Sequence, residues 1–104
     1  MDFDKDLAAR QEARQLCKQA EAAQQILGRM EQTELDRICA AVASRFSAAA
    51  PELAEMAAKD TGFGNAKDKT TKNRFASETV WEAIREMKAV GILREDPEKK
   101  LWEI

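Results

Sequence analysis

A run of apolar residues at helical spacing limits the folds open to this chain more than any other part of it. These residues fall at i, i+3, i+4, i+7 and i+11, with polar residues between them: Leu35, Ile38, Cys39, Val42 and Phe46. The spacing places them on one face, and it predicts a helix over residues 34–49. Thr33, with Asp36 three positions on, predicts an N-cap of the capping-box type. Because such a helix has one apolar face, it must pack against another element to be stable.

Helical patterns also run through the rest of the chain. Apolar spacing and stop signals predict three further helices and one extended piece: helices over 4–27, 51–60 and 67–90, and an extended segment over 101–104. Gly28 is predicted to end the first of these, Pro51 to open the next and Gly62 to end it. The last helix is expected to break near Ser77. The predicted fold is all-α, with about four amphipathic helices and a short C-terminal β-type segment in one unit over 1–104.

The predicted apolar faces are poor in large side chains. Many inward positions are alanine, and each alanine buries little area, so the hydrophobic driving force is small. We therefore expect a marginal bundle that packs better against a larger partner. Near the C-terminus, Ile92-Leu93 is a second predicted β-type piece, and Asp96-Pro97 predicts a turn.

Composition excludes several classes of function. The chain has 104 residues, 44% hydrophobic and 35% charged, which is typical of one folded domain or part of one. Its net charge of −2 gives no overall attraction for nucleic acid or anionic membranes. No apolar run approaches the ~20 residues that span a bilayer. The first residues, MDFDKDLAAR, lack the apolar core of a signal peptide, so a cytoplasmic location is expected.

The chain offers no set of residues suited to catalysis. It has two cysteines, Cys17 and Cys39, and no histidine to activate either, so both are predicted to be small buried hydrophobes rather than nucleophiles. A zinc site without histidine would need carboxylates to complete it, which is rare. Two carboxylate pairs are expected to face solvent: Glu31 with Glu34, and Glu95 with Asp96. We therefore predict no catalytic residue, no cofactor-binding residue and no metal ligand in this chain.

A glycine-containing loop and a basic cluster have two interpretations each. The loop Gly62-Phe63-Gly64 resembles part of a phosphate loop, but it follows a helix and lacks the third glycine, which favours a helix C-cap and a turn. Four basic residues follow it and are predicted to be a solvated helix surface rather than a site for nucleic acid or the phosphates of CoA: Lys67, Lys69, Lys72 and Arg74. Trp81 and Trp102 are expected to serve packing rather than stacking on a base.

The segment from Asp60 to Glu78, DTGFGNAKDKTTKNRFASE, carries a recognisable order of residues. Its motif positions are Thr61, Gly62, Gly64, Asp68, Lys69, Lys72, Asn73, Ala76, Ser77 and Glu78. A glycine with two aliphatic residues, an acidic turn and a strand come later: Gly91-Ile92-Leu93, Glu95-Asp96 and Leu101-Trp102-Glu103-Ile104. The order extends more loosely back to about Leu35. Together these positions resemble the N-terminal region of the CoA-acylating aldehyde dehydrogenases.

The resemblance implies what the complete enzyme does. In that family a cysteine thiolate attacks an aldehyde, hydride passes to NAD(P)⁺, and the acyl group is transferred to CoA. The catalytic cysteine and the nucleotide-binding motif lie beyond the region that resembles this chain, which ends at Ile104 in a predicted strand. The chain is thus expected to be a truncated piece of the α/β aldehyde dehydrogenase fold, without activity or cofactor of its own. Its expected partners are the rest of the dehydrogenase, in a homo-oligomer, and its location is the cytoplasm or a bacterial microcompartment.

Several alternatives stay open from the sequence. The chain is also consistent with a stand-alone helical module that binds a partner or itself through its apolar faces. The first helix is amphipathic, as are detachable targeting tags, but only residues 28–32 separate it from the next helix, which favours an integral helix. The aldehyde is undetermined among acetaldehyde, propionaldehyde, succinate semialdehyde and sulfoacetaldehyde, as is the choice between NAD and NADP.

Overall fold

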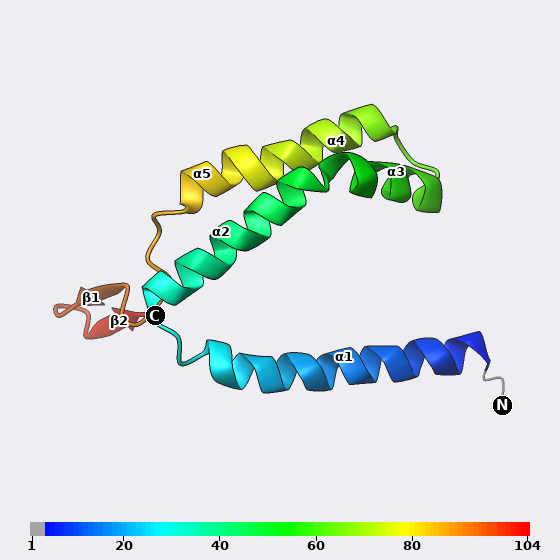
Figure 1. The fold of residues 1–104 in the computed structure, drawn as a ribbon. Helices are drawn as coiled ribbons and strands as arrows, with labels where there is room; N and C mark the ends of the chain where they lie inside the picture. The colour runs from blue at the N-terminus through cyan, green and yellow to red at the C-terminus, as the bar shows by residue number, and fades with distance from the viewer. Residues whose placement is uncertain (1–3) are drawn as a thin grey trace. The chain divides into compact units, whose positions relative to one another are not determined.

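The computed structural model describes residues 4–104. They form two compact units, one up to Glu31 and one over Gln32–Ile104, and each is described by itself. The single unit predicted over 1–104 includes residues 1–3, which lie outside the described part. As predicted, the fold consists of helices with a short two-stranded sheet at the C-terminus (Figure 1).

The first unit is one helix, α1, over Lys5–Leu27 (Figure 1). It starts one residue after the predicted position and ends where predicted. Gly28 caps its C-terminus, and its N–H donates to Gln24 O at 2.8 Å. The backbone of Gly28 has φ −63°, so this cap is right-handed and does not use the conformational freedom of glycine. None of the α1 side chains is buried.

The second unit begins with α2 over Gln32–Ala48, two residues before the predicted start. The predicted N-cap at Thr33 is therefore wrong, because Thr33 lies inside the first turn. The side chain of Gln32 instead forms one hydrogen bond within α2 and one with a segment far along the chain. Its Nε2 donates to Asp36 Oδ1 at 2.8 Å, and its Oε1 accepts from the N–H of Ala89 at 2.7 Å. Gln32 thereby joins the start of α2 to a segment 57 residues further along the chain.

Helix α3 spans Ala50–Thr61, with Pro51 in its first turn as predicted. It ends at Gly62, whose left-handed φ of 69° lets its N–H donate to Ala58 O at 2.9 Å. This geometry is the glycine C-cap expected from the sequence. A side chain at this position would be free of neighbours within 4 Å, so only the backbone conformation favours glycine here.

The predicted helix over 67–90 is a composite of three segments. They are α4 over Ala66–Arg74, the π-helical segment η1 over Phe75–Val80, and α5 over Trp81–Ile84. Ser77, where a break was expected, lies inside the π segment, and its Oγ donates to Asn73 O at 2.8 Å. Such back-bonding competes with the helical ladder and bends or widens a helix. The predicted end near Val90 is wrong, since the helix stops at Ile84.

The residues after the early end of the helix turn and then contact Gln32. After Ile84 the chain forms a tight turn, in which the N–H of Met87 donates to Ile84 O at 2.9 Å. The N–H of Ala89 is then taken by the side chain of Gln32 rather than by a helical carbonyl. The segment after Ile84 thus bonds to the start of α2 instead of continuing the helix.

The C-terminal hairpin pairs β1, Arg94–Asp96, with β2, Leu101–Glu103, in antiparallel register. The extended piece predicted over 101–104 is present, whereas the first strand lies just after the predicted Ile92-Leu93. The turn begins at Asp96, whose Oδ1 accepts from the N–H of Lys99 at 3.0 Å. Glu95 and Trp102 are paired across the strands, and Trp102 Nε1 donates to Glu95 Oε1 at 3.0 Å.

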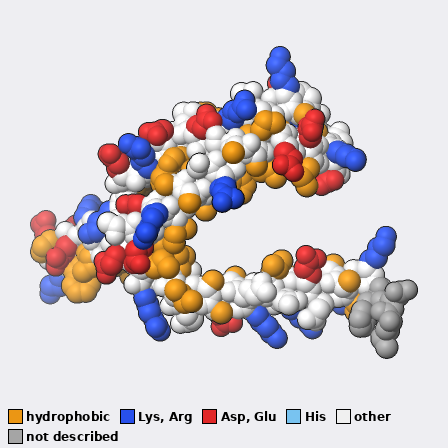
Figure 2. Space-filling model, viewed as in Figure 1, with side chains coloured by type: hydrophobic (Ala, Val, Ile, Leu, Met, Phe, Trp, Pro, Cys, Tyr) orange, Lys and Arg blue, Asp and Glu red, His pale blue; other side chains and the backbone are white. Residues whose placement is uncertain are grey.

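The buried core of the described residues is confined to one place. Only Ala50 and Ala54, both on α3, are buried. They lie where α3 packs against α4, which is the most extensive contact between elements. Asn73 adds a bond between the two helices, because its Nδ2 donates to Ala50 O at 3.2 Å. Figure 2 shows hydrophobic side chains on the surface along α2 and α3.

Gly62 provides a test of the α3 cap. Replacing it by alanine is expected to lower the free energy of unfolding by about 1 kcal/mol, because a Cβ is strained in the left-handed region. Gly62→Asn is the matched control and should cost less, since asparagine tolerates this conformation. Urea unfolding followed by circular dichroism measures both. An alanine variant as stable as the parent would contradict the assigned cap.

Asn73 provides a test of the contact between α3 and α4. Asn73→Ala removes the bond to Ala50 O and is expected to destabilise the chain by about 1 kcal/mol, as for other partly buried hydrogen bonds. Thr71→Ala on the exposed side of the same helix removes a local hydroxyl bond and should change stability by less than about 0.5 kcal/mol. Thermal unfolding of the two variants compares them. Equal effects would mean that Asn73 does not hold the helices together.

Candidate functional site

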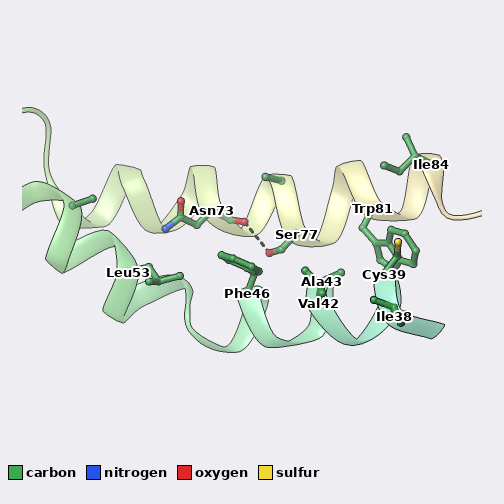
Figure 3. A pocket seen from close by; sticks show the side chains of 12 residues that line it. Ile38, Cys39, Val42, Ala43, Phe46, Leu53, Asn73, Ser77, Trp81 and Ile84 are labelled. Atoms are coloured by element: carbon green, nitrogen blue, oxygen red, sulfur yellow. Dashed lines mark hydrogen bonds between the residues drawn. The ribbon is translucent and has the colours of Figure 1, made fainter. Parts of the chain in front are cut away.

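The main concave feature of the second unit is an open groove of about 580 Å³ between α2 and the α4–η1–α5 run (Figure 3). The α2 wall consists of Ile38, Cys39, Val42, Ala43 and Phe46. The facing wall consists of Asn73, Ala76, Ser77, Trp81 and Ile84, and Leu53 and Ala57 of α3 close one end. The stripe read from the sequence of α2 thus lines a groove, apart from Leu35, which is half-buried outside it.

The second wall differs from the apolar face expected for the last helix. Helical spacing in the sequence places Phe75, Val80 and Met87 on the apolar face of that helix. In the structure these residues do not line the groove, and they are exposed. Two polar residues, Asn73 and Ser77, take inward positions instead. They do so at little cost because their donors reach nearby carbonyls, Ala50 O and Asn73 O respectively. The sequence pattern carries no signal for these inward positions, because polar residues on a helix normally face solvent.

The groove is apolar and open to solvent. Phe46 is 55% exposed, Val42 49% and Ile84 46%, so large side chains that would be covered in a complete core face water here. Trp81 is half-buried on the opposite wall, in agreement with the packing role expected for it. Contiguous exposed apolar surface of this kind is typical of a region that another structural element covers.

Both cysteines are exposed, contrary to the prediction that they are buried. Cys39 lies on the groove wall beside Trp81 (Figure 3). Cys17 lies on α1, where no side chain is buried. The helical pattern correctly places each thiol among apolar residues, but burial requires a second element over that face, and the described residues provide none.

The loop after α3 does not form a cradle for the pyrophosphate of NAD or CoA. Gly62 and Gly64 both have left-handed φ values, 69° and 71°, as a tight turn requires. Two donors of the loop are already used, however: Gly62 N–H donates to Ala58 O, and Phe63 N–H donates to Thr61 Oγ1 at 3.2 Å. The side chain of Phe63 projects into solvent and is 78% exposed. Neither these bonded donors nor the exposed Phe63 side chain is arranged to hold a pyrophosphate.

The N-terminus of α4 is likewise occupied by its own side chains. Asn65 is the N-cap, and its Oδ1 accepts from Asp68 N–H at 2.8 Å. The Asp68 carboxylate accepts in turn from Asn65 Nδ2 at 2.8 Å. This reciprocal cap fills the place where a phosphate would bind a helix N-terminus. The first turn of α4 thus carries a cap formed by the chain itself, which uses the N–H of Asp68.

The basic cluster is mainly a helix surface in contact with solvent. Lys67, Lys72 and Arg74 are exposed, and Lys69 is half-buried. A Cβ at Gly64 would lie 3.3 Å from Lys69 Cε, so the stem of Lys69 passes close to the glycine loop. This arrangement agrees with the solvated surface expected from the sequence.

The carboxylate pairs are used in local structure. Glu95 accepts from Trp102 and Asp96 from the N–H of Lys99, so both belong to the hairpin. Glu31 is exposed and Glu34 half-buried. Within residues 4–104, no three cysteine or carboxylate side chains are placed to share a metal ion. Across the same residues, no helix combines the length and the apolar character needed to cross a bilayer.

Comparison with known proteins places this segment within larger enzymes. No protein-family model matches the chain. The structure matches that of an acetylating aldehyde dehydrogenase from Geobacillus thermoglucosidasius with a TM-score of 0.83 and 44% identity, over 97% of this chain and 22% of that enzyme. In sequence it is 36% identical to the bifunctional aldehyde-alcohol dehydrogenase of Escherichia coli K12 over 81 residues, which are 78% of this chain and 9% of that protein.

A further relative is a sulfoacetaldehyde dehydrogenase of an Acholeplasma species, 35% identical over 86 residues. That match covers 81% of this chain and 18% of the relative. The chain therefore spans less than a quarter of each of these proteins. The names of these homologues are those of acetylating or related aldehyde dehydrogenases. The solved Geobacillus structure matches the fold over 97% of this chain. The homologues of this chain are thus acetylating aldehyde dehydrogenases, and the chain corresponds to a segment that makes up 22% of the solved Geobacillus enzyme.

Proposed function

We propose that this chain is the N-terminal helical portion of a CoA-acylating aldehyde dehydrogenase and serves it as a scaffold. One observation carries the proposal: the described residues bury only Ala50 and Ala54, yet they match the fold of a much longer enzyme with a TM-score of 0.83. A segment with so little core of its own is stabilised mainly by what it packs against. Its apolar groove is the surface on which the rest of the enzyme would pack.

The complete enzyme would convert an aldehyde, CoA and NAD(P)⁺ to acyl-CoA and NAD(P)H. We assign no step of this reaction to the present residues, since they offer no nucleophile with an activating base and no pyrophosphate cradle. Binding of NAD(P) and CoA, and the attacking cysteine, would belong to the remaining part of the enzyme. Assembly as a homo-oligomer in the cytoplasm or in a bacterial microcompartment forms part of the same proposal.

A second candidate is a free-standing helical module that associates with itself. The exposed apolar side chains on α2 and α5 favour it, because contiguous apolar surface promotes association. The two candidates differ in what covers the groove. A chain that stays monomeric over a wide range of concentrations in light scattering would rule out self-association. Only the scaffold proposal would then remain.

The scaffold proposal is tested by grafting. The matched segment of the Geobacillus thermoglucosidasius enzyme is replaced by this chain, and CoA-dependent aldehyde oxidation is followed by formation of NADH. We expect the chimera to keep activity within about ten-fold of the parent, because the two segments share 44% identity and one fold. The parent with its segment deleted serves as the control and should be inactive.

Four outcomes would contradict the scaffold proposal. One is CoA-dependent turnover by this chain alone, since it would then carry its own chemistry. Another is a deletion variant that is as active and as stable as the parent, because the segment would then support nothing. The remaining two are a folded but inactive chimera and a chimera that does not fold while the parent does.

A further inference from the structure

We propose that the groove between α2 and the α4–η1–α5 run binds an amphipathic helix from the remaining part of the dehydrogenase, and that this helix covers the thiol of Cys39. The inference rests on the proposed function and adds to it the kind of element that occupies the groove. The reactivity of the Cys39 thiol would then report whether the groove is covered, because this thiol is exposed on the groove wall.

The lining of the groove requires an apolar occupant. Apart from Asn73 and Ser77, its walls consist of apolar side chains and Cys39. The side-chain donors of those two residues are directed at Ala50 O and Asn73 O. A charged or strongly polar ligand would lose its hydration there without gaining matched partners. An apolar face, by contrast, would remove Val42, Phe46 and Ile84 from water.

The walls favour a helix over an extended segment. Both walls are helical, so their backbone N–H and C=O groups are used within α2 and within the α4–η1–α5 run. An extended segment would find no backbone partners in the groove, whereas a helix satisfies its own. A flat sheet face would leave the space between the walls unfilled, and unfilled apolar space is unfavourable. A helix laid between two helices fills it with interlocking side chains.

The length of the groove sets the size of the occupant. The wall from Asn73 to Ile84 spans 11 steps along the chain, or about 16 Å at the rise of a helix. That length matches about three turns of a helix with apolar residues at i, i+3 or i+4, and i+7. Figure 3 shows Ile38, Val42 and Phe46 of α2 on one side and Ser77 and Trp81 on the other, so such a helix would contact both walls.

The source of the helix follows from the comparison with solved structures. The segment matched by this chain is 22% of the Geobacillus enzyme, so most of that enzyme's chain lies outside the match. The match in fold is close, with a TM-score of 0.83, and it includes the elements that form the groove walls. In the complete enzyme, therefore, a groove of this shape would lie inside a much larger fold with further elements to fill it.

The experiment measures alkylation of Cys39 by iodoacetamide under native conditions, with modified peptides quantified by mass spectrometry. The grafted Geobacillus enzyme described above is compared with the free chain. Because a thiol reacts only when the reagent can reach it, we expect Cys39 to react about ten-fold or more slowly in the chimera. Val42→Asp on the groove wall should restore fast reaction, whereas Ala41→Asp, on the same helix outside the groove, should not.

Synthetic peptides keep the inference testable if the chimera fails to fold. Peptides copied from each helix of the Geobacillus enzyme outside the matched segment are added to the free chain. At least one should slow alkylation of Cys39 in the parent chain and in Ala41→Asp, but not in Val42→Asp.

Each other result overturns the inference. Fast alkylation of Cys39 in an active chimera would show that the groove stays open, while the scaffold role would stand. Protection that survives Val42→Asp would place the covering element elsewhere, and protection that rises with the concentration of the free chain would make a second copy the occupant. A chimera that does not fold, together with peptides that do not protect, would overturn the inference and the proposed function alike.

Discussion

The close approach of α3 to α4 organises the second unit of this protein. Ala50 and Ala54 are the only buried residues in the described chain, and their small side chains let the two helices approach closely. Asn73 reinforces the contact by donating to Ala50 O across it. Ala50 begins α3 just after the end of α2. The contact between α3 and α4 therefore also sets the direction of α2 relative to these two helices. The groove is a consequence of that arrangement.

The free energy of burying apolar side chains favours packing of a further element on this segment. Burying a Val, Ile or Phe side chain completely contributes about 1.5–3 kcal/mol, and an alanine contributes much less. Here the large side chains of α2 and α5 are about half exposed, so a substantial part of that free energy is not gained. Packing another apolar element on the groove would recover it. The same surface is what the proposed scaffold role would use.

Particular elements show how far local sequence rules reach. The α2 stripe, the proline at the start of α3 and the glycine that ends it were all predictable, since each depends on neighbours within one or two turns. The end of the last helix was not predictable in this way, and the residues that follow it bond to Gln32, 57 positions away in the chain. The inward positions of Asn73 and Ser77 were missed for a related reason: the carbonyls that satisfy them become available only once the helices are in place.

The sequence by itself determined that this is a helical segment with single apolar faces, and its motif order around Gly62 to Glu78 was sufficient to indicate the dehydrogenase family. Periodicity, caps and motif spacing are local properties, and they are written directly in the order of residues. Only the tertiary structure decided that the apolar faces of α2 and the α4–η1–α5 run form one open groove, and that Cys39 is exposed on its wall. Burial depends on which elements meet across space, and a pattern along one helix cannot specify what covers it.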